Sequence, residues 1–152
     1  MSEAPSYPYA SAIYYRDPRA ALVWLERAFG FETTMVVDAA DGGVIHSEMR
    51  AGRGLLMLGA ERDDNHRSPA SNRGVNTQSI HLYLDADLDA HCARARAAGA
   101  VITREPADQF YGERVYVATD LEGHIWSFGQ SLKGLSHAQL SEAGGHLVRA
   151  GL

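Results

Sequence analysis

Hydrophobic and polar positions repeat with the period of a strand in some segments and of a helix in others. The order of these segments is clear along the first half of the chain. Residues 9–16 (YASAIYYR) are rich in aromatic and β-compatible side chains, which predicts a strand. Asp17-Pro18 marks a helix start, because aspartate caps helix N-termini and proline suits the first turn. Apolar residues at helical spacing continue through "RAALVWLERAF" and end at Gly30. Glycine-bearing turns then separate three strand-like runs, at 31–38, 44–51 and 55–60.

The second half of the chain repeats this order, so each half is predicted to be a β-α-β-β-β module. The predicted elements are a strand at 79–85, a helix at 87–99, and strands at 100–105, 113–119 and 124–129, with a loop at 106–112. We expect a first module over residues 8–60, a linker over 61–76, a second module over 77–130 and a tail over 131–152. Ser136 can cap a helix in the tail, although Gly144-Gly145 weakens it.

The predicted fold class is α+β, with the two βαβββ modules forming a curved, cup-like mixed sheet and the helices outside. Alternation in the strand at 79–84 directs Ile80, Leu82 and Leu84 to the helix, and the intervening polar and aromatic residues to the cup. The same alternation places Trp126 and Phe128 in the core. Three polar residues flank the last tight turn, and no special role is expected for them there: Asp120, Glu122 and His124.

Composition narrows the function classes. The net charge is −5 and the arginines are scattered, whereas nucleic-acid binding favours a clustered basic face, so nucleic acid is not an expected partner. No run approaches the roughly 18 apolar residues that cross a bilayer, and the N-terminus lacks a signal-peptide pattern, so no membrane association is expected. The single Cys92 cannot form an internal disulfide, which favours the cytoplasm, and its mid-helix position among alanines does not indicate a nucleophile.

Three segments, "RDPRAALVWLERAFGFE", "DLDAHCARARAAGA" and "ATDLEGHIWSFG", carry a resemblance to a known family. Together with the paired modules, they resemble the vicinal oxygen chelate superfamily of glyoxalases, bleomycin-resistance-type binding proteins and extradiol dioxygenases. The resemblance covers about residues 8 to 130. It implies the paired-module fold and a homodimer, since paired subunits of this family often complete each other's cups, although a compact chain can also close its own.

The resemblance also implies where a divalent ion would be held, on His, Glu or Gln from the first and last strands of each module. Carried onto this sequence, those positions are Ala10 or Ser11, Met57, Ser79 and Ser127. Hydroxyls and a thioether are poor ligands for such ions, so we expect no metal and no cofactor. Without a Lewis acid the isomerase and dioxygenase chemistry lacks its electrophile. The sequence therefore indicates a binding protein similar to the resistance-type members.

The expected activity is the binding of a small aromatic or cationic molecule in the cup without a metal, and no catalytic residue is assigned. The irregular segment 105–114 carries an aromatic pair that can fold over the cup mouth as a lid. The expected ligand-binding residues are Tyr14, Met57, Ser79, His81, Tyr83, Phe110, Tyr111 and Ser127.

Two enzymatic alternatives remain open. One is a divalent-metal-dependent lyase, isomerase or dioxygenase with a shifted site. His46 and Glu48 share a strand face and His81 lies on the first strand of the second module, so the three could form a His-His-carboxylate set. The other is metal-free acid–base catalysis by His81, since an ordinary imidazole has a pKa of about 6.5.

Overall fold

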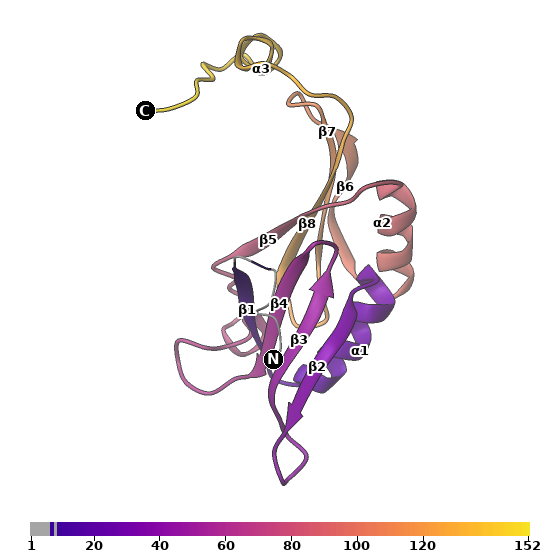
Figure 1. The fold of residues 1–152 in the computed structure, drawn as a ribbon, viewed down its shortest axis with the longest axis vertical. Helices are drawn as coiled ribbons and strands as arrows, with labels where there is room; N and C mark the ends of the chain where they lie inside the picture. Colours follow the sequence, from indigo (N-terminus) through magenta and orange to yellow (C-terminus); the bar gives the residue numbers. More distant parts are fainter. Residues whose placement is uncertain (1–6, 8) are drawn as a thin grey trace, which may run out of the picture.

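The computed structural model describes residue 7 and residues 9–152. The chain folds into two successive β-α-β-β-β modules and a C-terminal helix (Figure 1), which confirms the α+β fold expected from the sequence. The first module contains β1 (Ala10–Tyr15), α1 (Pro18–Phe29), β2 (Glu32–Asp38), β3 (Val44–Ala51) and β4 (Gly54–Ala60). The second contains β5 (Ser79–Tyr83), α2 (Leu88–Ala97), β6 (Val101–Asp108), β7 (Glu113–Thr119) and β8 (Ile125–Ser131). A short 3₁₀ turn, η1 (Pro69–Ser71), lies in the linker, and α3 (His137–Gly144) follows the second module.

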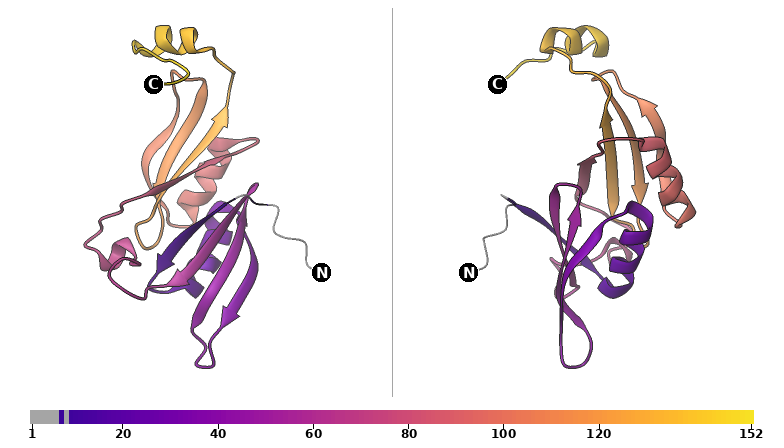
Figure 2. Two further views of the ribbon diagram at one scale, coloured as in Figure 1. Left: turned by 60° about the vertical axis from the view of Figure 1, so that its left-hand side comes forward. Right: turned by 45° about the vertical axis from the view of Figure 1, so that its right-hand side comes forward.

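Each module forms its own four-stranded mixed sheet. The strand order is β1-β4-β3-β2 in the first sheet and β5-β8-β7-β6 in the second. The first and last strands of each module pair in parallel, and the other pairs are antiparallel. Figure 2 shows the two sheets one above the other, with α1 and α2 on the same side of the molecule. Each sheet therefore has one helix-covered face and one face without a helix, which we call the helix-free face.

A single aromatic core joins the two modules on the helix side. Phe29, at the end of α1, packs against Phe31 at 5.5 Å, against Trp126 at 5.5 Å and against Phe128 at 4.8 Å between ring centroids. Trp126 and Phe128 are fully buried, as their strand parity predicted. Burying side chains of this size stabilises the fold by roughly 1.5–3 kcal/mol each. The two modules therefore share one hydrophobic core.

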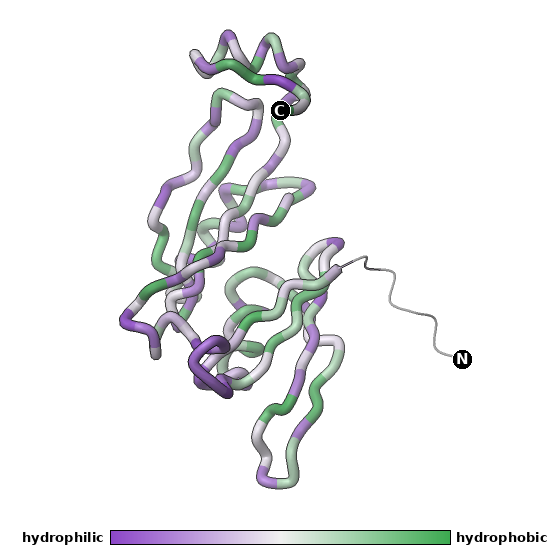
Figure 3. Tube along the Cα trace, turned by 90° about the vertical axis from the view of Figure 1, so that its left-hand side faces the viewer, coloured by the Kyte–Doolittle hydropathy of each residue, from purple (hydrophilic) through white to green (hydrophobic). Residues whose placement is uncertain are grey.

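The strands alternate between the two faces as predicted. In β5, Ile80 and Leu82 pack against the core, while Tyr83 is exposed on the helix-free face. Figure 3 shows hydrophobic and hydrophilic residues interchanging along the strands. β6 extends further than expected, to Asp108, because register shifts after Ile102 and Arg104 let it continue pairing with β7. The predicted loop at 106–112 is therefore shorter and begins after Asp108.

The tail does contain the helix that Ser136 predicted. The Ser136 side chain accepts from the Gln139 N–H, and the Gln139 side chain accepts from the Ser136 N–H, which completes a capping box. Gly145 ends the helix in a left-handed conformation, so the glycine pair terminates the helix instead of preventing it. α3 buries none of its residues and lies beyond the β6–β7 hairpin, away from the two sheets (Figure 1). Among the described residues, no helix has the length and apolar character needed to span a bilayer.

Candidate functional site

The helix-free face of the second sheet brings together most of the residues expected to bind a ligand. Alternation along β5 places Ser79, His81 and Tyr83 on this face. The β5–β8 register sets His81 beside Ser127 and Tyr83 beside Gly129. Four polar side chains therefore lie on neighbouring strands: an imidazole, a phenol, and two hydroxyls.

His81 is at the centre of this face. Its Nδ1 lies 2.9 Å from Ser127 Oγ, which is hydrogen-bond distance. Its Nε2 lies 3.9 Å from the Glu113 carboxylate, at the start of β7. The imidazole ring meets the Tyr83 ring edge-on, with 4.8 Å between centroids. One polar side chain is thus held by three neighbours from three strands.

Glu113 also lies on this face, although it was not among the residues predicted from the sequence. Its negative charge is the main cause that raises the pKa of the Tyr83 phenol, followed by burial, by the hydrogen bond from the phenol to Glu113 and by Tyr111. The carboxylate therefore acts electrostatically on Tyr83, its neighbour on the same face. Period-two alternation in β7 could have placed Glu113 there, but the residue stood at the boundary of the predicted loop and strand.

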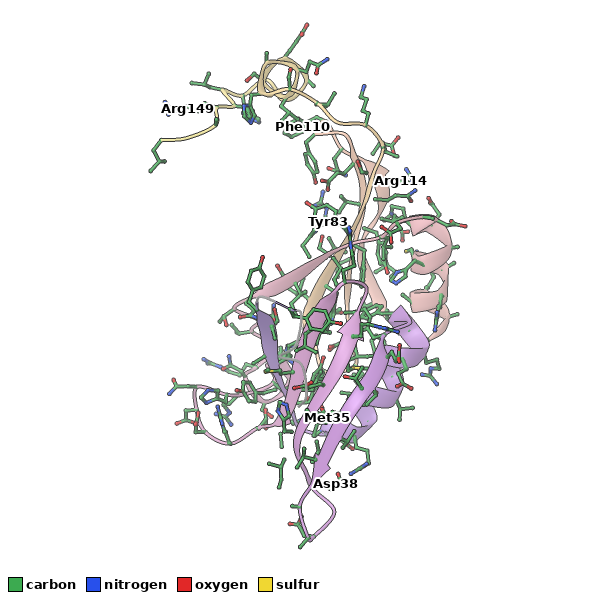
Figure 4. The ribbon with its side chains drawn as sticks, in the orientation of Figure 1. Met35, Asp38, Tyr83, Phe110, Arg114 and Arg149 are labelled. Carbon is green, nitrogen blue, oxygen red and sulfur yellow. The ribbon has the colours of Figure 1, made fainter. Side chains whose placement is uncertain are left out.

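The β6–β7 hairpin supplies the two other predicted aromatic residues. Phe110 and Tyr111 pack edge to face, 5.2 Å apart between centroids, and are both exposed. Phe110 also touches the tail, where its ring lies 6.2 Å from that of His146. Figure 4 shows Tyr83 and Phe110 between the body of the molecule and the overhanging α3, while Arg114 lies toward α2. The aromatic surface thus extends from β5 to the C-terminal helix.

Tyr14 and Met57, the remaining predicted ligand residues, lie on the first sheet. Met57 faces the helix-free side, beside Ala12 and Glu48 in the strand register. Tyr14 instead holds the linker: its hydroxyl accepts a hydrogen bond from Arg62 Nη2 at 3.0 Å, and its ring meets His66 at 4.7 Å. Within one chain these two residues do not join the cluster around His81.

A separate cavity of about 360 Å³ lies under the linker, between the edge strands β1 and β5. Its walls include Tyr14, Ile80, His124, Asn72 and Gln78. Of the ligand-binding residues expected from the sequence, Tyr14 alone belongs to this lining. This cavity is therefore distinct from the helix-free face of the second sheet. The candidate site is the face, because the aromatic and ionisable side chains gather there.

The residues of the shifted metal site do not meet within one chain. His46 Nε2 and Glu48 Oε1 lie 3.3 Å apart on β3, whereas His81 lies on the other sheet. Among the described residues, no group of three or more His, Cys, Asp or Glu side chains is arranged to hold an ion. The positions that the family resemblance would use for a metal offer a thioether and hydroxyls, and Ser127 Oγ already contacts His81. This donor set does not fit a divalent ion.

The turn before β8 has a role that the sequence analysis did not assign. Asp120 is buried, and its carboxylate accepts from Tyr15 Oη at 2.6 Å, from Trp126 Nε1 at 3.0 Å, and from the N–H groups of Glu122 and His124. Burial, followed by the Asp120 charge, raises the pKa of the Tyr15 phenol well above its ordinary value. The expectation that these polar residues need no special role is wrong, because the fold brings β1 against the turn.

Two further residues complete this connection between the modules. The Glu122 carboxylate accepts from the N–H groups of Arg16 and Asp17, at 2.8 and 3.0 Å. His124 is half-buried, and its Nε2 lies 2.9 Å from the carbonyl oxygen of Tyr14. We call these contacts, made by Tyr15, Asp120, Glu122, His124 and Trp126, the seam.

Residues 9–128 match the Glyoxalase/Bleomycin resistance protein/Dioxygenase superfamily, and the chain belongs to this family. An uncharacterized protein of Mycobacterium bovis is 30% identical over 131 residues, which cover 84% of this chain and 85% of the relative. The crystal structure of TioX from Micromonospora sp. ML1 is 32% identical, with a TM-score of 0.68, over 84% of this chain and 99% of TioX. TnmS3, an antibiotic binding protein from Streptomyces sp. CB03234, shares the fold at 18% identity and a TM-score of 0.64, over 86% and 99% of the two chains.

Proposed function

We propose that this protein binds a small, planar organic molecule on the helix-free face of the second sheet, without a metal ion. The observation that carries the proposal is the exposure of three aromatic side chains on the second module: Tyr83, which meets His81, is 63% exposed, and Phe110 and Tyr111 of the β6–β7 hairpin are 45% and 38% exposed. Clustered exposed aromatic surface is unusual on a monomer and is typical of a binding site. Stacking on such rings adds about 0.5–1.5 kcal/mol per pair beyond area burial.

The residues at the positions where the family would hold a metal support binding rather than metal-assisted catalysis. Ser79 and Ser127 on the second sheet and Met57 on the first stand where the family would require imidazole or carboxylate ligands, and such groups do not polarise a substrate as a bound ion does. TnmS3 has the same fold and is an antibiotic binding protein, which supports a binding role for this architecture. We therefore propose capture of an antibiotic-like or similar aromatic compound.

We further propose that two copies of the chain complete the site. Met35 and Val37 lie beside Glu48 and His46 in the strand register and are each 40% exposed on the first sheet. A homodimer in which the first sheet of one copy faces the second sheet of the other would cover this apolar surface. It would also bring Met57 to the aromatic residues around His81. Light scattering coupled to size-exclusion chromatography measures the expected dimer mass.

A thermal-shift screen tests the binding proposal, because a ligand that binds only the folded chain stabilises it, by about 2.7 kcal/mol at a hundredfold excess over Kd. Aromatic antibiotics, glutathione adducts and catechols form the panel. A hit should lose its effect in Tyr83→Ala and keep it in Tyr9→Ala, which removes a tyrosine that is 86% exposed before β1.

Metal titration distinguishes the binding role from the metal-dependent alternative. Cobalt or nickel is added to protein purified without chelator, in wild type and in His81→Ala. We expect no stoichiometric binding. Tight binding of one ion per chain that disappears in His81→Ala would replace the binding proposal by a metal-dependent lyase, isomerase or dioxygenase that uses His46, Glu48 and His81.

A further inference from the structure

The Glu113 side chain lies close to the backbone of β8 on the helix-free face of the second sheet. A Cβ added at Gly129 on β8 would lie 3.1 Å from Glu113 Oε2 and 2.9 Å from His81 Nε2. Because Gly129 has no side chain, the carboxylate and the imidazole can both lie against the β8 backbone. The Glu113 side chain is only 21% exposed, so its charge is largely shielded from bulk water.

Other carboxylates of the second module are neutralised by the chain itself. Arg114 pairs with Asp89 and Asp108, at 2.8 and 2.7 Å, and Arg96 pairs with Glu105 at 2.6 Å. Asp120 accepts four hydrogen bonds. The paired Asp89, Asp108 and Glu105 are exposed, whereas the buried Asp120 needs its hydrogen bonds, because a buried charge is costly unless it is compensated.

Glu113 lacks such compensation. Within the part of the chain that the structure describes, no Arg or Lys side chain pairs with its carboxylate; its polar neighbours are His81, at 3.9 Å, and the Tyr83 phenol, whose hydrogen bond to Glu113 contributes to the raised pKa of Tyr83. A carboxylate has about four acceptor positions and the phenol supplies one donor, so Glu113 retains acceptor positions for a ligand. A partly buried carboxylate that keeps its acceptor positions free is suited to a donor that arrives with a ligand.

The aromatic neighbours favour the same kind of donor. Tyr83 meets His81 edge-on at 4.8 Å, and Tyr111 meets Phe110 edge-on at 5.2 Å. Tyr83 lies close enough to Glu113 and to Tyr111 for their charges to interact with it, as its raised pKa shows. The faces of aromatic rings are electronegative and attract cations. A carboxylate beside such rings selects a positive group and disfavours an anionic one.

We propose that Glu113, Tyr83, Tyr111 and Phe110 form a cation-binding corner, so that the ligand is a planar molecule carrying a protonated amine or a quaternary ammonium. This inference rests on the proposed function, since it names the class of ligand that the same face binds. Glu113 pairs with the positive nitrogen, and the aromatic side chains contact its carbon substituents and the adjoining ring system.

The test compares two fluorescent planar probes that differ in charge, 10-methylacridinium and the uncharged 10-methylacridone. Each is titrated into the full-length protein at neutral pH. Wild type should bind the cation at least about tenfold more tightly, because only the cation gains Coulomb attraction to the Glu113 carboxylate. Glu113→Gln should bring the two affinities within about threefold, because the amide keeps the shape and removes the charge. Glu105→Gln is the matched control: it makes the same change on β6, where Glu105 is already paired with Arg96, and it should leave the preference intact.

The outcomes separate this inference from the proposed function. If both probes bind and Glu113→Gln preserves the wild-type ratio, the cation-binding corner is wrong and the binding function stands. A second copy of the chain that neutralises Glu113 would give this result. If neither probe binds to the folded wild-type protein, both proposals fail. Raising the salt from about 0.05 to 0.5 M should reduce the preference in wild type and leave Glu113→Gln unchanged, and an unchanged wild-type preference contradicts the inference independently of any variant.

Discussion

Two carboxylates of the second module, Asp120 in the seam and Glu113 on the helix-free face, have opposite surroundings. Asp120 is 6% exposed and receives four hydrogen bonds from its own chain. The Glu113 side chain is 21% exposed, and among the described residues its polar neighbours are His81, at 3.9 Å, and the Tyr83 phenol, with no arginine or lysine partner. A carboxylate whose acceptor positions are filled from within holds the fold together, whereas one that keeps acceptor positions and an uncompensated charge is available to a ligand. The comparison separates a structural role for Asp120 from the ligand-binding role proposed for Glu113.

Replacing Asp120 is the most severe test of this contrast. Asp120→Ala leaves the Tyr15 hydroxyl, the Trp126 indole N–H and two backbone N–H groups without their acceptor, and buried donors of this kind cost roughly 1–3 kcal/mol each. We expect a loss of about 3–5 kcal/mol in the free energy of unfolding, measured by urea denaturation. Glu113→Ala should change it by less than about 0.5 kcal/mol. Similar losses for the two variants would erase the distinction.

Removing one donor of the seam should have an intermediate effect. Tyr15→Phe deletes the hydroxyl that donates to Asp120 at 2.6 Å and should destabilise the fold by about 1–2 kcal/mol. The neighbouring Tyr14→Phe removes a hydroxyl that contacts Arg62 at the exposed linker, and its effect should be within about 0.5 kcal/mol. Urea denaturation of the pair measures the difference. A larger loss for Tyr14→Phe would place the main connection between the modules outside the seam.

Acid should weaken the contact between the modules through His91. Its Nε2 lies 3.0 Å from the Phe29 carbonyl and its Nδ1 lies 2.7 Å from the Tyr116 hydroxyl, so the neutral ring donates to the carbonyl and accepts from the phenol. Burial is the main cause that lowers the pKa of His91 below its ordinary value. The unfolded chain therefore binds the proton more readily, and stability falls as the pH drops below about 6.5.

The measurement for His91 is the urea midpoint at pH 7.5 and at a pH below the ordinary histidine range. We expect a smaller acid-induced drop in His91→Gln, whose amide can keep one of the two contacts but does not titrate. The difference between the proteins should be smaller than the effect of Tyr15→Phe. An identical acid response in wild type and His91→Gln would assign the pH dependence to other groups.

The smallest predicted effect on stability concerns the contact between Phe110 and α3. A Cβ at Gly144 would lie 2.4 Å from Phe110 Cε2, so Gly144→Ala forces α3 and the Phe110 ring apart. Because α3 buries no residue, the free energy of unfolding should change by less than about 0.5 kcal/mol. Limited proteolysis should nevertheless cleave the tail faster. Gly134→Ala, which meets nothing within 4 Å, is the control and should be cleaved at the wild-type rate.

Much of the fold could be predicted because its signals are local. The Asp17 cap, the helical spacing that ends at Gly30, and the alternation that separates Ile80 from His81 all act between residues a few positions apart. The same alternation correctly buried Trp126 and placed Tyr83 on the open face. The order of the elements and the face of each strand follow from such short-range patterns.

The partners of the ionisable groups were decided only by the tertiary structure. Asp120 meets Tyr15 across 105 positions of sequence, and Glu122 meets Arg16 across 106, so nothing in the local pattern of the turn reveals the seam. The surroundings of Glu113 are likewise set by residues on other strands, by the phenol of Tyr83 and by Gly129, which has no side chain. Periodicity records which way a side chain points, whereas the charge balance at a site depends on which distant strands the fold places beside it.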